Sequence, residues 1–126
     1  MITLTLLLLP AVFAVQGCKS KEERAAVLAQ QADAYAQAGN LVAARQAIGE
    51  AISLREDQST YHELQGAIAL RSNDTIGAYR SFQRALEFDA INKTALAYVA
   101  NIGVQVGQLD DAEAACLLYT SPSPRD

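Results

Sequence analysis

Residues that build chemical sites are scarce in this sequence. It contains one histidine, His62, and two cysteines, Cys18 and Cys116. Because a metal site needs clustered ligands and a disulfide framework needs paired cysteines, the sequence predicts neither. The seven glycines form no phosphate-binding run, and no serine lies in the glycine-flanked setting of a catalytic nucleophile. We therefore predict no catalytic residue, no cofactor, no metal and no enzyme in this segment. We expect His62 at the surface or at the edge of a groove.

Basic residues are also few. Lys and Arg number 10 against 14 Asp and Glu, which gives a net charge of −4. Nucleic-acid-binding domains usually present a clustered basic surface, so this composition argues against a nucleic-acid partner. Asp110, Asp111 and Glu113 form an acidic cluster. We interpret it as the first turn of a helix, where the helix dipole favours carboxylates, rather than as a carboxylate site.

Apolar and small residues recur every three or four positions through most of the chain. In one segment they are Leu28, Ala32 and Tyr35, and in the next they include Leu41 and Ile48. This spacing places them on one face of a helix. The alternation typical of strands is absent. The sequence therefore predicts an all-α protein.

Turn and capping residues divide these helices into pairs. Residues that tolerate a left-handed backbone lie between the helices of each pair, at Gly39-Asn40, Asn73-Asp74 and Gly107. Asn40 and Asp74 can also accept a hydrogen bond from the free amides of the following helix. Two further spacings fit a capping box, namely Ser20 to Glu23 and Thr60 to Glu63.

Small residues also recur over a longer interval. Ala44, Ala78 and Ala112 are equally spaced, and the same interval separates Ala51 from Ala85. This interval of about 34 residues resembles the period of the tetratricopeptide repeat (TPR). The resemblance implies antiparallel helix-turn-helix repeats stacked as a right-handed α-solenoid, with unit 1 at residues 25–58, unit 2 at 59–92 and a partial unit 3 at 93–115. The residues that it assigns to packing between helices are Ala32, Ala44, Ile48, Ala51, Gly66, Ala78, Phe82, Ala85, Ala100 and Ala112.

The sequence departs from the repeat pattern at two kinds of position. Ala90 stands where proline is commonest at the end of a unit. The large aromatic residue that the family carries early in the first helix is replaced by Leu28, His62 and Leu96. Degenerate repeats of this kind still resemble the family, because the small packing residues are retained.

The TPR resemblance also implies a binding surface. In that family the first helices of the units line a concave groove that holds an extended peptide or a partner's helix. The inward positions implied by the resemblance include Asp33, Glu63, Leu70, Arg71 and Asn101. They lack the lysine and asparagine set with which some members bind a carboxylate terminus, so binding of such a chaperone tail is not predicted. The expected partner is a protein or peptide, and simple solvent exposure is the alternative interpretation of each position.

The first residues of the chain resemble a bacterial lipoprotein signal. Residues 2–15 are apolar and uncharged, too few for a bilayer, which needs about 20 residues, but suited to an export signal. The following Gly17-Cys18 resembles a lipobox, although Met1 to Thr5 has no basic residue. The resemblance implies a signal peptide at 1–17, acylation of Cys18 and a tether over 18–24. The alternatives are a cleaved secretory signal or a short buried N-terminal helix.

The last residues, 116–126, break the repeat pattern. Their sequence, CLLYTSPSPRD, matches the translation of an adapter that transposase-based library kits attach to DNA. We interpret this segment as an artefact and expect the native chain to continue beyond Ala115. The alternative is a disordered Ser/Pro tail.

Together these patterns predict a membrane-anchored, periplasm-facing TPR scaffold in a bacterial cell envelope. Lipid on Cys18 would provide the anchor, and the outer membrane is favoured because no aspartate follows Cys18. The expected role is protein-protein interaction in envelope assembly, secretion or polysaccharide export. One alternative is the N-terminal recognition arm of a larger envelope enzyme whose catalytic domain is missing. Another is a soluble TPR protein, if Cys18 is not acylated.

Overall fold

The computed structural model describes residues 19–122, which fold as six helices without a strand. The helices are α1 (Lys21–Gln37), α2 (Leu41–Leu54), α3 (Ser59–Arg71), α4 (Thr75–Phe88), α5 (Lys93–Val106) and α6 (Leu109–Thr120). The all-α prediction is therefore confirmed. The predicted signal peptide, Cys18 and residues 123–126 lie outside the described residues.

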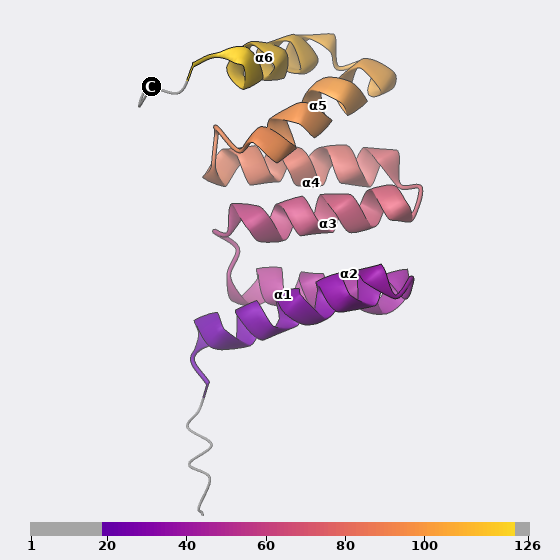
Figure 1. Ribbon diagram of the computed structural model, residues 1–126, viewed down its shortest axis with the longest axis vertical. Helices are drawn as coiled ribbons and strands as arrows, with labels where there is room; N and C mark the ends of the chain where they lie inside the picture. The colour runs from indigo at the N-terminus through magenta and orange to yellow at the C-terminus, as the bar shows by residue number, and fades with distance from the viewer. Residues whose placement is uncertain (1–18, 123–126) are drawn as a thin grey trace, which may run out of the picture.

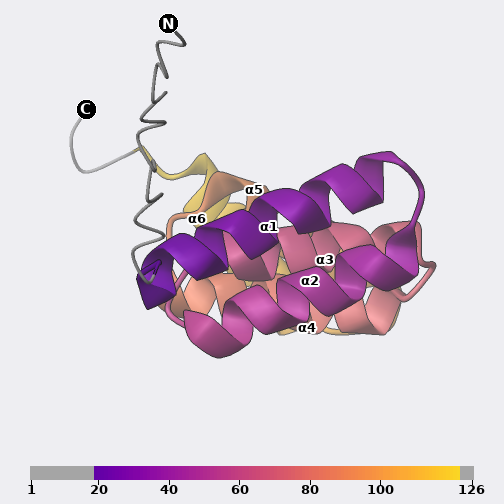
Figure 2. The ribbon, with the colours of Figure 1, turned by 90° about the horizontal axis from the view of Figure 1, so that it is seen from below.

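Consecutive helices pack as pairs, and the pairs stack into a solenoid. The helix α1 packs on α2, α3 on α4, and α5 on α6, while contacts of α2 with α3 and of α4 with α5 join neighbouring pairs. The stack runs along the long axis of the molecule from α1 and α2 to α5 and α6 (Figure 1). Seen along that axis, α2 and α4 lie on one side and α1 and α5 on the other (Figure 2). Because α1 also contacts α3, the first helices of the first two pairs adjoin one another.

The turns within the pairs have the predicted left-handed backbone. The φ angles are 82° at Gly39, 58° at Asn73 and 79° at Gly107. A glycine has no Cβ to clash at these angles, and asparagine tolerates them better than most residues. The chain can therefore reverse within a few residues, which brings the two helices of each pair together.

Three of the four predicted caps are present. The side chains of Asn40 and Asp74 accept hydrogen bonds from Ala43 N at 3.2 Å and Gly77 N at 2.9 Å. The Ser20–Glu23 capping box is formed in both directions. The Thr60–Glu63 box is wrong, because the N-cap residue of α3 is Gln58, two residues before Thr60, and its side chain makes no capping hydrogen bond.

Small and branched residues form the core in two clusters. One joins α1, α2 and α3 and includes Ala32, Ile48 and Ile68, and the other joins α3 to α6 around Phe82 and Leu96. All residues assigned to helix packing are buried except Ala100, which is half-buried against the second cluster. Alanine permits close approach of the helices, so the core consists of thin layers rather than one large centre.

Phe82 connects three helices. Its side chain is fully buried on α4, and its ring stacks on Tyr98 of α5 with the centroids 4.4 Å apart. On the other side the ring lies against Gly66 of α3, where an added Cβ would come within 2.8 Å of the ring. The glycine at this position therefore makes room for the phenylalanine.

The expectation that His62 lies at the surface or at a groove edge is wrong. Its side chain is 4% exposed, and its ring stacks on Phe88 with the centroids 5.4 Å apart. Nε2 lies 2.8 Å from the carbonyl oxygen of Glu56 and donates to it, because a carbonyl oxygen only accepts. The loop before α3 thus covers the ring. Leu96, at the equivalent position of the next unit, is also buried, so this repeat position belongs to the core in both units.

Candidate functional site

The surface of α1, α3 and α5 carries the five residues predicted to meet a partner, and we call it the first-helix face. Asp33, Arg71 and Asn101 are exposed on it, and Glu63 and Leu70 are half-buried. Because α1 adjoins α3 and a pocket joins α3 to α5, this face is continuous along the stack.

Leu70 and Asn101 come together at one pocket of this face. The pocket lies between the end of α3, the start of α4 and the side of α5, with a volume of about 330 Å³. We call it the α3–α5 pocket. Its lining consists of Leu70, Thr75, Ala97, Tyr98, Asn101, Ile102 and Gln105. Residues from two successive units thus build it, and neither unit could form it alone.

The α3–α5 pocket combines apolar walls with an amide pair. Leu70, Tyr98 and Ile102 supply large apolar surfaces, and the Tyr98 ring is fixed by its stacking on Phe82. The Gln105 Nε2 donates a hydrogen bond of 2.7 Å to Asn101 Oδ1. Within residues 19–122 the other ends of these two amides, one donor and one acceptor, make no hydrogen bond. They are therefore available to an incoming polar group.

Charges on the first-helix face are sparse and partly engaged. The Asp33 carboxylate accepts a hydrogen bond of 2.7 Å from Gln37 Nε2 in the same helix. The Glu63 carboxylate accepts one of 3.0 Å from Asn92 Nδ2. Arg71 is exposed in the last turn of α3. Asp33, Glu63 and Arg71 do not line the α3–α5 pocket, and only Arg71 is next in sequence to a residue that does, Leu70.

Glu63 has a structural role that the sequence did not reveal. Asn92 caps α5 by accepting from Ala95 N at 2.9 Å, and its Nδ2 donates both to Glu63 and to Ser59 Oγ at 3.1 Å. Ser59 Oγ in turn donates to Ala85 O at 2.9 Å. This network ties the start of α3 to the end of α4 and the start of α5. Its partners lie in different helices and far apart in the sequence, so no local signal could have indicated it.

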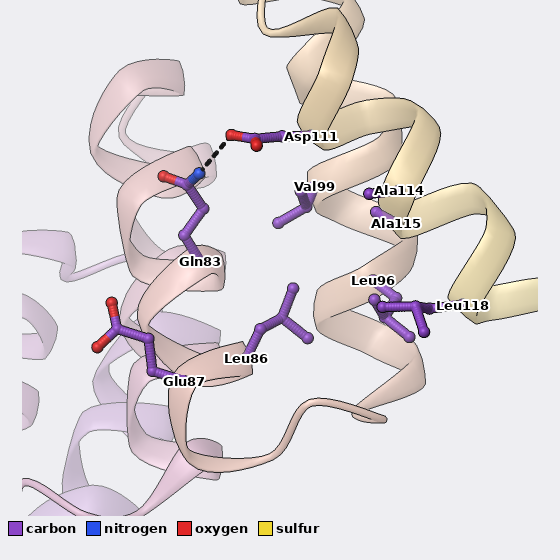
Figure 3. A pocket seen from close by; sticks show the side chains of 9 residues that line it. All are labelled: Gln83, Leu86, Glu87, Leu96, Val99, Asp111, Ala114, Ala115 and Leu118. Atoms are coloured by element: carbon purple, nitrogen blue, oxygen red, sulfur yellow. Dashed lines mark hydrogen bonds between the residues drawn. The ribbon is translucent and has the colours of Figure 1, made fainter.

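A second, larger cavity of about 410 Å³ lies between α4 and α6, over α5 (Figure 3). We call it the α4–α6 groove. Leu86, Leu96, Val99 and Leu118 are among the apolar side chains that line it. At its edge Gln83 Nε2 donates to Asp111 at 2.9 Å (Figure 3). Leu118 belongs to the segment after Ala115, so the α6 wall of this groove includes one residue of the segment that breaks the repeat.

Asp111 has a structural role in addition to its place in the acidic first turn of α6. Asp110 and Asp111 lie in the first turn of α6, as predicted. Asp111 also accepts a hydrogen bond of 2.8 Å from the Tyr79 hydroxyl, and Tyr79 is 6% exposed. Burial and then this hydrogen bond raise the pKa of Tyr79 to about 12. The contact links α4 to α6 across neighbouring units.

Residues 19–122 hold no group of three or more His, Cys, Asp or Glu side chains arranged to bind a metal. Over the same range, no helix has the length and hydropathy needed to cross a membrane. The free Cys116 is exposed on α6.

No family model and no curated protein matches this sequence, but solved structures match its fold. The second TPR of Spaghetti bound to the HSP90 peptide SRMEEVD has a TM-score of 0.71 at 13% identity, over 78% of this chain and 91% of that chain. The Arabidopsis OM64 TPR domain has a TM-score of 0.70 at 19% identity, over 85% of this chain and 88% of that chain. The Yersinia enterocolitica type III secretion chaperone SycD, in complex with a peptide of the translocator YopD, has a TM-score of 0.67 at 19% identity, over 79% of each chain.

These likenesses define the architecture as an all-α, TPR-like solenoid, and they confirm the fold predicted from the repeat spacing. Two of the three similar structures hold a bound peptide, according to their descriptions. At identities of 13% and 19%, the likeness extends to the fold and not to the identity of any ligand.

Proposed function

We propose that this chain is a non-catalytic scaffold that binds a protein or peptide on its first-helix face. The observation that carries the proposal is the α3–α5 pocket, an open cavity of about 330 Å³ with apolar walls and an available amide pair. Concave surfaces with a few polar groups among apolar side chains are typical of binding sites. The bound peptides in two proteins of similar fold support the same role.

Binding on this face can be tested with two substitutions of matched chemistry. Val104 is 61% exposed on α5, at the repeat position equivalent to Leu70, and Val42 is 82% exposed on α2, the second helix of its pair. A partner would be sought by cross-linking the tagged chain in a bacterial envelope preparation, with Val104→Asp and Val42→Asp in parallel. We expect Val104→Asp to lose the cross-linked partner and Val42→Asp to retain it. Equal retention by both variants would refute binding on the first-helix face.

We further propose that the scaffold is anchored to the membrane through lipid on Cys18 and faces the periplasm, at the outer membrane. The apolar segment before Cys18 and the Gly17-Cys18 pair support this. Anchoring raises the local concentration of whatever the face binds, which suits envelope assembly, secretion or polysaccharide export. The test is radiolabelled palmitate incorporation and membrane fractionation of the wild type and Cys18→Ala. If Cys18→Ala stays in the membrane fraction unchanged, the chain is a soluble TPR protein or is held by another means.

We also propose that the residues after Ala115 are adapter-derived and that the native chain continues. Units 1 and 2 carry a large apolar residue and then alanine at two equivalent positions, Ile48 and Ala51 in one and Phe82 and Ala85 in the other, where this segment has Cys116 and Tyr119. The segment thus reverses the sizes that the repeat pattern requires. Sequencing the genomic locus past the codon of Ala115 tests this, and finding the codons of 116–126 in contiguous genomic DNA would refute it. A catalytic domain downstream would instead favour the recognition arm of an envelope enzyme.

A further inference from the structure

We infer that the solenoid lies on the membrane along one edge, with the side chain of Ile91 inserted into the lipid. The edge consists of the start of α1, the α2–α3 loop and the α4–α5 loop, which lie on the same side of the stack (Figure 1). We call it the inter-pair edge. This orientation rests on the proposed anchoring through Cys18, because it names the surface of the chain that meets the anchoring membrane.

Ion pairs join the start of α1 to the two loops of the inter-pair edge. Glu22, four residues after Cys18 in the sequence, lies in the first turn of α1, with its Oε1 3.8 Å from Arg55 Nη1. Arg55 and Glu56 belong to the α2–α3 loop, and Glu56 pairs with Arg84 near the end of α4. The turns within the pairs lie at the other ends of the helices, and α1 alone is about 25 Å long. Lipid on Cys18 would therefore bring the loops toward the bilayer and hold those turns away from it.

The α4–α5 loop offers an exposed apolar side chain at this edge. Ile91 is 62% exposed, whereas Phe88 at the end of α4 is held by stacking on His62 and by the Arg84 guanidinium 5.0 Å from its ring centroid. Insertion of Ile91 into lipid would remove its apolar surface from water. A lipid anchor keeps the loop close to the bilayer, so one apolar side chain is sufficient to orient the chain.

Hydrogen bonds within the α4–α5 loop reduce the cost of entering the lipid. The Ile91 N–H donates to Asp89 Oδ1 at 3.2 Å, and the Asn92 N–H donates to the carbonyl oxygen of Asp89 at 3.1 Å. Backbone groups without a partner are costly in hydrocarbon, so a loop whose amides are bonded internally is suited to insertion. At the position equivalent to Ile91, the α2–α3 loop has Asp57, which binds Arg55 at 2.9 Å. Insertion is therefore specific to the α4–α5 loop.

The charges of the inter-pair edge do not account for a membrane contact. Two arginines each lie between two carboxylates, with Glu22 and Asp57 around Arg55, and Glu56 and Glu87 around Arg84. The other charged residues near the edge are four cations and four carboxylates, namely Lys19, Lys21, Arg24, Lys93, Glu23, Glu50, Glu63 and Asp89. Carboxylates thus slightly outnumber cations, and no attraction to anionic lipids follows. The contact is apolar, so we expect it on uncharged phosphatidylcholine.

The test compares two isoleucines at opposite ends of α4. Ile76 is 59% exposed in its first turn, and Ile91, 62% exposed, follows its end. In a Cys116→Ser background, Ile91→Cys and Ile76→Cys would be labelled with bimane, in the full chain acylated in bacteria and reconstituted into phosphatidylcholine vesicles. We expect the label at 91 to be quenched by a nitroxide-bearing lipid and to lose quenching by aqueous iodide. The label at 76 should be quenched by iodide alone.

Acylation and orientation give separate readouts. If radiolabelled palmitate is not incorporated into the wild type, the proposed anchoring fails and the membrane contact fails with it. If the chain is acylated but iodide quenches both labels equally, the contact is overturned while the anchoring stands. Protection of the label at 91 from iodide without quenching by the nitroxide lipid would indicate a protein contact, such as a second copy of the chain, and would also overturn it.

Discussion

Replacing Gly66 with alanine should destabilise this protein, although alanine is the better helix former. In an unhindered helix the substitution would gain about 1 kcal/mol. At Gly66 the new Cβ would lie 2.8 to 2.9 Å from three carbon atoms of the Phe82 ring, closer than contacting carbons tolerate. The ring cannot move away freely, because it is fully buried and stacked on Tyr98. Overpacking of this kind costs about 1–3 kcal/mol, so we expect a net loss of about 1 kcal/mol.

Gly49 provides the control. It lies inside α2, is exposed, and has no atom within 4 Å of the position of an added Cβ. Gly49→Ala should therefore stabilise the fold by about 0.5–1 kcal/mol. Urea denaturation followed by circular dichroism would measure the free energy of unfolding of both variants. Thermal unfolding would provide a second measurement, in which each 1 kcal/mol should shift the Tm by about 4–8 °C. The two substitutions are chemically identical, so opposite signs isolate the contact with Phe82.

The result that would refute this reasoning is a Gly66→Ala variant as stable as Gly49→Ala. A double-mutant cycle provides a second check. Phe82→Leu shortens the side chain that the new methyl group meets, so it should cost less in the Gly66→Ala background than in the wild type. We expect a coupling free energy above about 0.5 kcal/mol, and additive effects would place the clash elsewhere.

Three further predictions concern contacts between units. The pKa of Tyr79, raised from 10.0 to about 12, means that this group contributes stability below pH 10 that is lost as the pH rises toward 12. Tyr79→Phe should therefore reduce the fall in Tm between pH 10 and pH 12 measured by circular dichroism; an unchanged fall would contradict it. Asn40→Ala should lose only a helix cap, worth about 1 kcal/mol. Asn92→Ala should destabilise the fold by more, because Asn92 also bonds to α3. Equal losses of unfolding free energy in urea denaturation would argue against the network. Asp111→Asn should weaken the link of α6 to α4 and increase hydrogen exchange in α6, and unaltered exchange would show that the bond to Tyr79 contributes little.

Local signals were sufficient to predict the helices and most of their ends. The three-to-four spacing of apolar residues decides which segments are helical, and Gly39, Asn73 and Gly107 end helices because of their own backbone preferences. The cap at Asn40 reaches only three residues along the chain. Each of these features depends on neighbours in the sequence, so reading the sequence in short windows recovers it.

Contacts between helices could not be predicted in this way. His62 is polar, and only the folded structure places Phe88 of the same unit and the carbonyl of Glu56 around it. The bond from Tyr79 to Asp111 joins two helices of different units. Such contacts depend on how one helix packs on another, which no short window of the sequence contains. The repeat spacing held a signal that the surface prediction for His62 did not use, since His62 and the buried Leu96 occupy equivalent positions.

The same repeat positions also explain why one surface is the better candidate for partner binding. Within unit 2, Ser81 Oγ of α4 donates to Gln65 Oε1 of α3 at 3.1 Å, so these polar groups satisfy each other. Val99 and Ala115 occupy the positions equivalent to Gln65 and Ser81 in the next unit. Both are apolar and both line the α4–α6 groove. Its wall includes Leu118, however, and would change with the segment that follows Ala115. The α3–α5 pocket is built entirely of residues between 70 and 105, so its chemistry is the same whichever sequence completes α6.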